Sequence, residues 1–213
     1  MAGAGSAQRR ARRSGPEGAT MSLRSNDRQW GSVAKFFHWV IALGILGNGL
    51  FGLLMDLAHS PMQKINWLAL HKSIGLTVLA LALLRIAWRW ADHRPPDEPM
   101  PRWQRLAAQA AHGVLYVLIV LLPLSGWWFN SVTGKPLQWF KQFNLPALVA
   151  KNDALRDVAH GVHEYLFWFL LLVLVAHVGG ALKHHVFDND NVLRRMLPFG
   201  RLRERSTSEG DHR

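Results

Sequence analysis

The chain has 213 residues, 49% of them hydrophobic, and a formal net charge of +11 at pH 7. Its length suggests one domain. It contains no cysteine, which excludes disulfides, thiolate zinc sites, iron–sulfur clusters held by this chain and covalently attached c-type haem. A haem held only by histidine stays open.

Four segments are nearly free of charge over about 20 residues each, the length at which a helix crosses the hydrocarbon core of a bilayer. A soluble bundle would show polar residues every three to four positions, and the run VLYVLIVLLPLSGWWF shows no such repeat. We therefore expect an all-α integral membrane protein, an antiparallel up-and-down four-helix bundle. The expected spans are residues 34–55, 68–90, 107–129 and 160–183.

The basic residues gather before the first span, between the second and third, and after the fourth, whereas the other two connections are nearly balanced. This asymmetry follows the positive-inside rule and places both termini in the cytoplasm. The excess of basic residues is therefore explained by the membrane topology, and it gives no reason to expect nucleic acid as a partner. We expect a membrane domain over residues 29–198 between disordered basic tails at 1–28 and 199–213, with Met21 as an alternative start to Met1.

The long third connection is amphipathic in places. Its aromatic and apolar side chains are expected to lie along the outer membrane surface as a lid. These residues are Trp139, Phe140, Phe143 and Leu145.

Histidines occur inside or beside these oily spans. His163 and His177 lie fourteen residues apart on the fourth span, a rise of about 21 Å that nearly completes four turns, so both share one face. Because alternate spans run in opposite directions, His71 falls at the outer level of His163, and His38 at the inner level of His177.

A low-spin b-type haem takes two axial imidazoles from facing helices, and the core of a four-helix bundle is a usual place for it. The two depth-matched pairs therefore predict haem in the bundle core, between His71 and His163 and between His38 and His177. A lone intramembrane histidine can instead bond to a neighbouring backbone. Glycines nearby can leave room for a porphyrin or allow close helix packing. They are Gly44, Gly47, Gly49, Gly52, Gly75, Gly179 and Gly180.

Arg85 follows His71 by fourteen residues and returns to the same face at the inner level. There it can pair with a haem propionate, or it can simply snorkel to the interface. His112 also lies at the inner level and is the alternative to His38 as partner of His177, although we favour His38. His112, His184 and His185 are candidates for contact with a propionate or a quinone, but surface histidines without a role are common.

Four stretches together resemble the bacterial cytochrome b561 family, in the branch grouped with the b-type cytochrome subunits of nickel hydrogenases. The resemblance covers about residues 27–198. The stretches are KFFHWVIALGILG, LHKSIGLTVLALALLRIAWR, AAHGVLYVLIVLLPLSGW and VHEYLFWFLLLVLVAHVGGALKHHVFDNDNVLRRMLP.

The resemblance implies two b haems in a bacterial inner-membrane bundle, with ligands at the positions of His38, His71, His163 and His177, and electron transfer to or from ubiquinone. The short chain is most similar to the stand-alone type that oxidises superoxide at the outer face. Positive charge there could draw such an anion or could merely solubilise the loops. The lysines concerned are Lys72, Lys135, Lys141 and Lys151.

Two other functions fit parts of this pattern, and no catalytic residue is assigned. A haem-binding membrane anchor would pass electrons from a partner dehydrogenase or hydrogenase to quinone without a substrate of its own. A transporter would line a path for a metal ion or protons with the intramembrane histidines.

Overall fold

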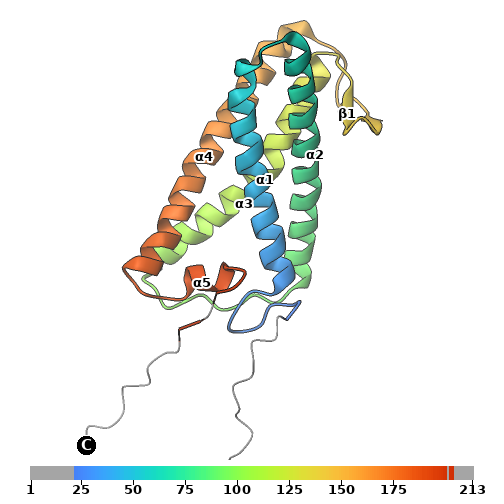
Figure 1. Ribbon diagram of the computed structural model, residues 1–213. Coiled ribbons are helices and arrows are strands. Elements are labelled where there is room, and N and C mark those ends of the chain that lie inside the picture. Colours follow the sequence, from blue (N-terminus) through green and yellow to red (C-terminus); the bar gives the residue numbers. More distant parts are fainter. Residues whose placement is uncertain (1–21, 201, 204–213) are drawn as a thin grey trace, which may run out of the picture.

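The computed structural model describes residues 22–200 and 202–203. Four long helices run up and down in turn (Figure 1), and each is long and apolar enough to cross a membrane. They are α1 (Ser32–Leu53), α2 (Pro61–Ala91), α3 (Arg102–Val132) and α4 (Arg156–Val186). The expected all-α membrane bundle is confirmed. The helices extend beyond most of the expected spans because their ends reach past the hydrocarbon core.

The helix starts and surfaces follow from the sequence. Ser60 caps α2 by accepting a hydrogen bond from the Gln63 N–H at 3.2 Å, and proline stands at the first helical position. Large apolar side chains point away from the bundle, for example Leu43 and Leu172, which are 65% and 66% exposed. Such a surface suits lipid rather than water.

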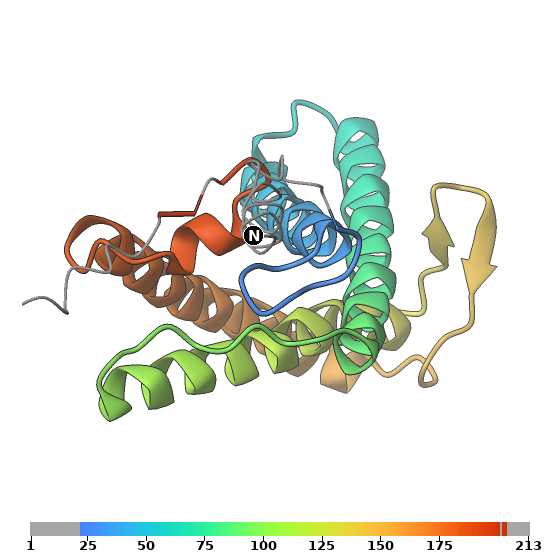
Figure 2. The same ribbon diagram turned by 90° about the horizontal axis from the view of Figure 1, so that it is seen from below.

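The bundle consists of two helix pairs. Helix α1 packs along α2, α3 packs along α4, and α2 joins the pairs by packing on α3, whereas the backbones of α1 and α4 make few close approaches (Figure 2). An apolar cavity of about 150 Å³ lies between α1 and α4. It is lined by Ile45, Leu46, Leu50, Leu53, Phe167, Leu170, Leu171 and Leu174.

We call the end where α1 begins and α4 finishes the inner end, after the predicted orientation, and the opposite end the outer end. A short helix, α5 (Val192–Met196), lies beneath the inner end (Figure 2). The Trp39 indole N–H donates to the Met196 carbonyl at 3.0 Å. Arg195 forms a 2.8 Å ion pair with the buried Glu98 of the α2–α3 connection. The segment after α4 is thereby fixed to α1 and to the α2–α3 connection.

The chain ahead of α1 also folds back at the inner end. Ser25 bonds to the Asp92 carboxylate through its amide at 3.1 Å and its hydroxyl at 2.6 Å. The end of the expected tail, which the sequence places at residue 28, is thereby held at the inner end by a contact that is distant in sequence. Residues 1–21, including Met21, and residues 201 and 204–213 lie outside the described residues, so the rest of both expected tails is not described.

The third connection forms a hairpin of β1 (Leu137–Trp139) and β2 (Phe143–Leu145). It lies against the side of α2 rather than across the outer end (Figure 1), so the expected lid is wrong in position. The reason is a pair of hydroxyls on α2. Ser73 Oγ accepts from the Phe140 N–H at 2.9 Å, and Thr77 Oγ1 accepts from the Trp139 indole at 3.0 Å. Two remaining short 3₁₀ turns are η1 (Leu54–Leu57) and η2 (Asp153–Leu155).

We predict that Ser73→Ala loosens this hairpin. The buried Ser73 hydroxyl accepts from the Phe140 N–H in the hairpin turn and lies within donating distance of the Gln138 carbonyl on β1 and the Ala69 carbonyl on α2. Loss of such a hydrogen bond costs about 1 kcal/mol of stability. Trypsin should therefore cut after Lys141, at the hairpin turn, faster in the variant than in the parent protein. Ser60→Ala removes a hydroxyl from the same helix far from the hairpin and serves as the control. Equal cleavage rates in all three proteins would show that Ser73 does not hold the hairpin.

Candidate functional site

The structure brings the four spaced histidines together as two pairs at two levels. At the outer level the ring centroids of His71 on α2 and His163 on α4 lie 6.3 Å apart, with planes at 89°. At the inner level the centroids of His38 on α1 and His177 on α4 also lie 6.3 Å apart, with planes at 65°. Each of these two pairs joins residues that the sequence places at one depth, and the assignment of the four histidines as ligands stays a prediction.

This spacing fits one metal ion between each pair of rings. A metal–imidazole bond is about 2 Å long and the ring centre lies roughly 1 Å beyond the nitrogen, so two rings on opposite sides of one ion have centroids about 6 Å apart. His112 also faces His177, but their centroids lie 5.2 Å apart. That separation is shorter than about 6 Å, whereas the separation of His38 and His177 is close to it. Neutral imidazoles from facing helices are the ligands that b-type haem uses.

The His71 imidazole is held against α1 by a hydrogen bond and a glycine, and we call such a contact surface the seat of the imidazole. Its Nδ1 lies 3.2 Å from the Asn48 carbonyl oxygen, which can only accept, so this nitrogen carries the proton and Nε2 is free to bind a metal. The Asn48 side-chain amide donates to the His71 carbonyl at 3.1 Å. A Cβ at Gly52 would stand 3.1 Å from Cε1 of the ring. The glycine therefore lets the ring lie against α1.

The His163 imidazole has a similar seat on α3. Ser125 Oγ donates its one hydrogen to the Leu122 carbonyl at 2.7 Å and lies 2.9 Å from Nδ1 of His163, so it accepts the imidazole proton. Next to it, a Cβ at Gly126 would stand 3.0 Å from Cε1 of the ring. Both outer imidazoles thus have a hydrogen-bond acceptor on Nδ1 and a glycine against Cε1.

The inner pair lies beside a cation instead. Arg85, expected at the inner level from its spacing, reaches across to α1. One of its guanidinium nitrogens donates to the Ala34 carbonyl at 3.3 Å, and another lies 3.4 Å from Nδ1 of His38. Its guanidinium carbon stands 5.7 Å from the ring centroid of Tyr116. The positive charge is thereby held next to the inner imidazoles inside the bundle.

Two further candidates lie at the inner end of α4. His184 Nδ1 is engaged by the Asp190 and Asp188 carboxylates at 2.7 and 3.0 Å, so this nitrogen is occupied in the turn after α4. His185 Nδ1 is buried and has no hydrogen-bond partner in the described part of the chain. The two adjacent histidines therefore differ at Nδ1, which is bonded in His184 and has no partner among the described residues in His185.

Apart from Gly52, the glycines that the sequence places near the histidines divide into two groups. Cβ atoms at Gly44 and Gly49 would stand 2.9 Å from Val78 Cγ2 and 2.6 Å from Phe167 Cε2, which is close packing. The others lie in looser surroundings, where a Cβ at Gly75 would come no closer than 3.6 Å to another residue and one at the remaining positions would meet nothing within 4 Å. These remaining positions are Gly47, Gly179 and Gly180.

Sequence reasoning missed the outer seats. Asn48 and Ser125 are uncharged polar residues inside apolar spans, at the depth of the outer histidines, and Gly126 stands directly beside Ser125. The shared depth of these polar residues and the outer histidines was the feature of the sequence that could have predicted the seats. Which acceptor meets which ring nitrogen depends on how the helices are rotated about their axes, and a sequence period cannot provide this.

Four apolar spans with facing imidazole pairs inside the bundle define the class of membrane-bound b-type cytochromes. The chain matches the family prokaryotic cytochrome b561 over residues 29–199 and belongs to that family. The resemblance seen in the sequence is thus confirmed. The protein is a bacterial membrane protein of b-type cytochrome character that takes part in electron transfer, with b-type haem as the cofactor of the family.

Several relatives align over nearly their whole lengths. Cytochrome b561 homolog 2 of Escherichia coli K12 is 35% identical over 83% of this chain and 95% of its own. The probable superoxide oxidase CybB of Yersinia pestis is 27% identical over 76% and 91%. Cytochrome b562 of Cereibacter sphaeroides is 28% identical over 75% and 89%.

We predict that Gly126→Ala and Gly52→Ala each reduce the haem content of the purified protein. The added methyl group would push against Cε1 of His163 or His71 and displace the imidazole. Disturbing the support of a metal-binding histidine costs about 10–100-fold in affinity. Haem per polypeptide, measured as pyridine haemochrome, checks the result.

Each helix offers a matched control. Gly113→Ala on α3 and Gly47→Ala on α1 place the same methyl group where nothing lies within 4 Å. Both controls should keep the parent haem content. A loss of haem that is equal in all four variants would attribute the effect to helix packing and not to the imidazole seats.

Proposed function

We propose that this chain is a dihaem b-type cytochrome that carries electrons between a donor on the outer side of the membrane and ubiquinone. The observation that carries the proposal is the pair of 6.3 Å imidazole separations at two levels of one bundle. We assign His71 with His163 to the outer haem and His38 with His177 to the inner haem. Bound haem supplies a one-electron couple between ferric and ferrous iron.

The chain's own residues fit this role. An imidazole on each side of the metal favours electron transfer over oxygen chemistry, because it leaves no open coordination position. The gap between α1 and α4 is lined by apolar side chains, which suit a porphyrin. If His38 binds iron through Nε2, its Nδ1 carries the proton. The Arg85 guanidinium can only donate, so it cannot be the acceptor for that proton. Arg85 is then available to pair with a negatively charged propionate, as its position suggests.

The outer face favours an anionic donor such as superoxide, and a relative of this chain carries the name probable superoxide oxidase. Lys72 follows His71 in the sequence, and its ammonium group donates to Asn130 Oδ1 at 3.0 Å. Lys141 lies at the tip of the hairpin, and Lys151 pairs with Asp153 at 3.0 Å. The charge of Lys151 is therefore partly offset, and we assign the attraction of the anion mainly to Lys72, Lys135 and Lys141.

Quinone reduction needs protons, and histidine is the natural local source. At the inner end His112 faces His177, and His185 keeps a buried ring nitrogen with no partner among the described residues. We place the quinone near these two residues, with both termini and the inner end on the cytoplasmic side as the basic segments suggest.

The first test counts haem. We expect the purified protein to bind two b haems per chain by pyridine haemochrome. Alanine at His71 or His163 should remove the outer haem, and alanine at His38 should remove the inner haem. His112→Ala is the matched control at the inner level and should keep both. One haem in the parent protein would contradict the dihaem assignment, and loss of the inner haem in His112→Ala but not in His38→Ala would exchange the two ligands.

The second test concerns the donor. We expect the purified protein alone to reduce a soluble ubiquinone analogue with superoxide, and the rate to fall as ionic strength rises because the attraction of an anion to the lysines is screened. His71→Ala, which lacks the outer haem, should be inactive. Full haem content without superoxide-driven reduction would favour the membrane anchor that serves a partner dehydrogenase.

A further inference from the structure

We propose that Ser125 is a positioning residue for the outer haem ligand His163, and that the hydrogen-bonded outer seats make the outer site the one with the lower midpoint potential. The inference rests on the proposed function, because it requires haem at both levels. It concerns the order of the two potentials, about which the spacing of the histidines says nothing.

The outer seats act on the metal through the distant ring nitrogen. A metal-binding imidazole that donates its other N–H to an acceptor becomes a more electron-rich ligand. At the outer level both rings do this, His163 to the Ser125 hydroxyl at 2.9 Å and His71 to the Asn48 carbonyl at 3.2 Å. An electron-rich ligand stabilises ferric over ferrous iron, which lowers the midpoint potential.

Ser125 is built into this position. Its hydroxyl is locked by donation to the Leu122 carbonyl at 2.7 Å, and the residue is only 7% exposed. With its hydrogen used, the oxygen can only accept from His163. Gly126 clears the space for the ring on the same turn of α3. The hydroxyl oxygen therefore accepts the imidazole proton, next to the Leu122 carbonyl, and helps to fix the direction of the ring.

The inner level is built differently. The group that faces Nδ1 of His38 is the Arg85 guanidinium at 3.4 Å, a donor and a cation. In the described part of the chain no hydrogen bond reaches a ring nitrogen of His177. A nearby positive charge, also one that offsets the negative charge of a propionate, favours the less positive ferrous state and raises the potential. At the outer level the Lys72 ammonium is directed to Asn130 and the Pro136 carbonyl instead of to an imidazole.

The two effects act in the same direction, so the outer site should have the lower potential and the inner site the higher one. This order suits a carrier whose donor lies on the outer side, because the acceptor end then has the greater affinity for the electron. It arises from hydroxyl, carbonyl and guanidinium groups on α1, α2 and α3 and not from the ligands themselves.

The experiment is a redox titration of the full-length haem-loaded protein, followed by its visible spectrum, in the parent and in Ser125→Ala. We expect the lower potential to rise and the higher one to stay. The Leu122 carbonyl remains near the imidazole, so the ferric-over-ferrous preference should change about two- to tenfold, or about 18–59 mV for one electron. Ser125→Thr keeps the hydroxyl and should restore the parent value.

Two controls complete the design. Ser131→Ala removes a hydroxyl on the same helix that bonds to the Trp127 carbonyl and the Leu148 N–H, and it should shift neither potential. His71→Ala, which keeps only the inner haem, should titrate near the higher parent potential, and this measurement does not depend on the folding of any Ser125 variant. The ferric EPR signal that disappears in His71→Ala should be the one altered in Ser125→Ala.

The outcomes separate the inference from the proposed function. Fewer than two haems in the parent protein would contradict the proposed function itself. Two haems with an unshifted or lowered lower potential in Ser125→Ala, or a single inner haem that titrates at the lower value, would overturn the order of potentials and leave the dihaem assignment intact.

Discussion

At the outer level each buried imidazole has an acceptor on a neighbouring helix for the proton on one of its nitrogens, and the build of the outer site follows from these two hydrogen bonds. Water is absent from the hydrocarbon core, so the acceptor must come from a neighbouring helix. The carbonyl of Asn48 and the hydroxyl of Ser125 meet this need for His71 and His163. In doing so they leave the opposite nitrogen of each ring without a hydrogen bond to the described part of the chain, and the two ring centroids lie 6.3 Å apart.

Each outer seat lies within one helix pair. His71 on α2 is seated by α1, and His163 on α4 is seated by α3, so each pair carries its own oriented imidazole. The pairs meet where α2 packs on α3 and where the imidazoles face one another, while the backbones of α1 and α4 make few close approaches. A cofactor held between the rings would therefore also hold the two pairs together, which links cofactor binding to the stability of the bundle.

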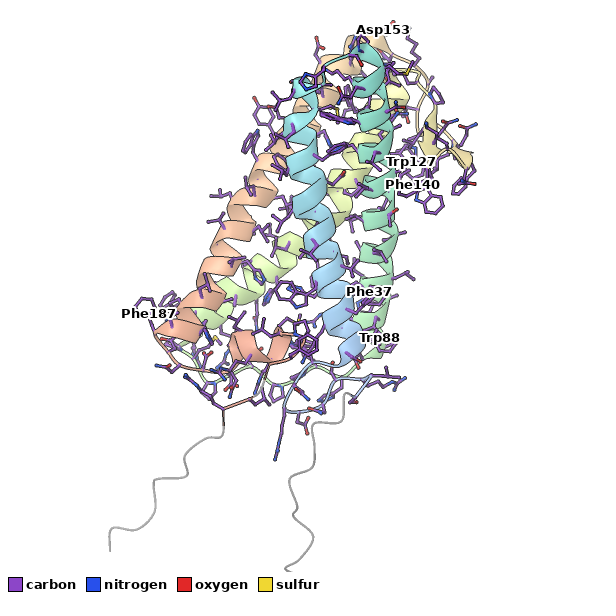
Figure 3. All side chains as sticks on the ribbon, in the orientation of Figure 1. Phe37, Trp88, Trp127, Phe140, Asp153 and Phe187 are labelled. Carbon is purple, nitrogen blue, oxygen red and sulfur yellow. The ribbon has the colours of Figure 1, made fainter. Side chains whose placement is uncertain are left out.

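The inner end of the bundle is held together by polar contacts outside the apolar spans. At the inner end, Arg195 of α5 joins the buried Glu98, and Ser25 joins Asp92, so segments far apart in sequence are fixed together. The side chains of Phe37 and Trp88 lie near this end, and Trp127 and Phe140 lie towards the outer end (Figure 3). Aromatic side chains at these two levels suit the two interfaces of a membrane.

The sequence by itself determined the four spans, the all-α class, the two histidine levels and the position of Arg85, because each depends only on local hydropathy or on the rise and rotation of a helix. The assignment of the ligands stays a prediction that this spacing supports. Only the tertiary structure decided the imidazole seats, the hairpin on α2 and the α5 closure. The seats depend on helix rotation and on missing Cβ atoms at Gly52 and Gly126, and contacts between helices have no sequence period. The hairpin turn places Phe140 and Lys141 at positive φ, where glycine or asparagine is the usual signal, so tertiary contacts to α2 had to select it.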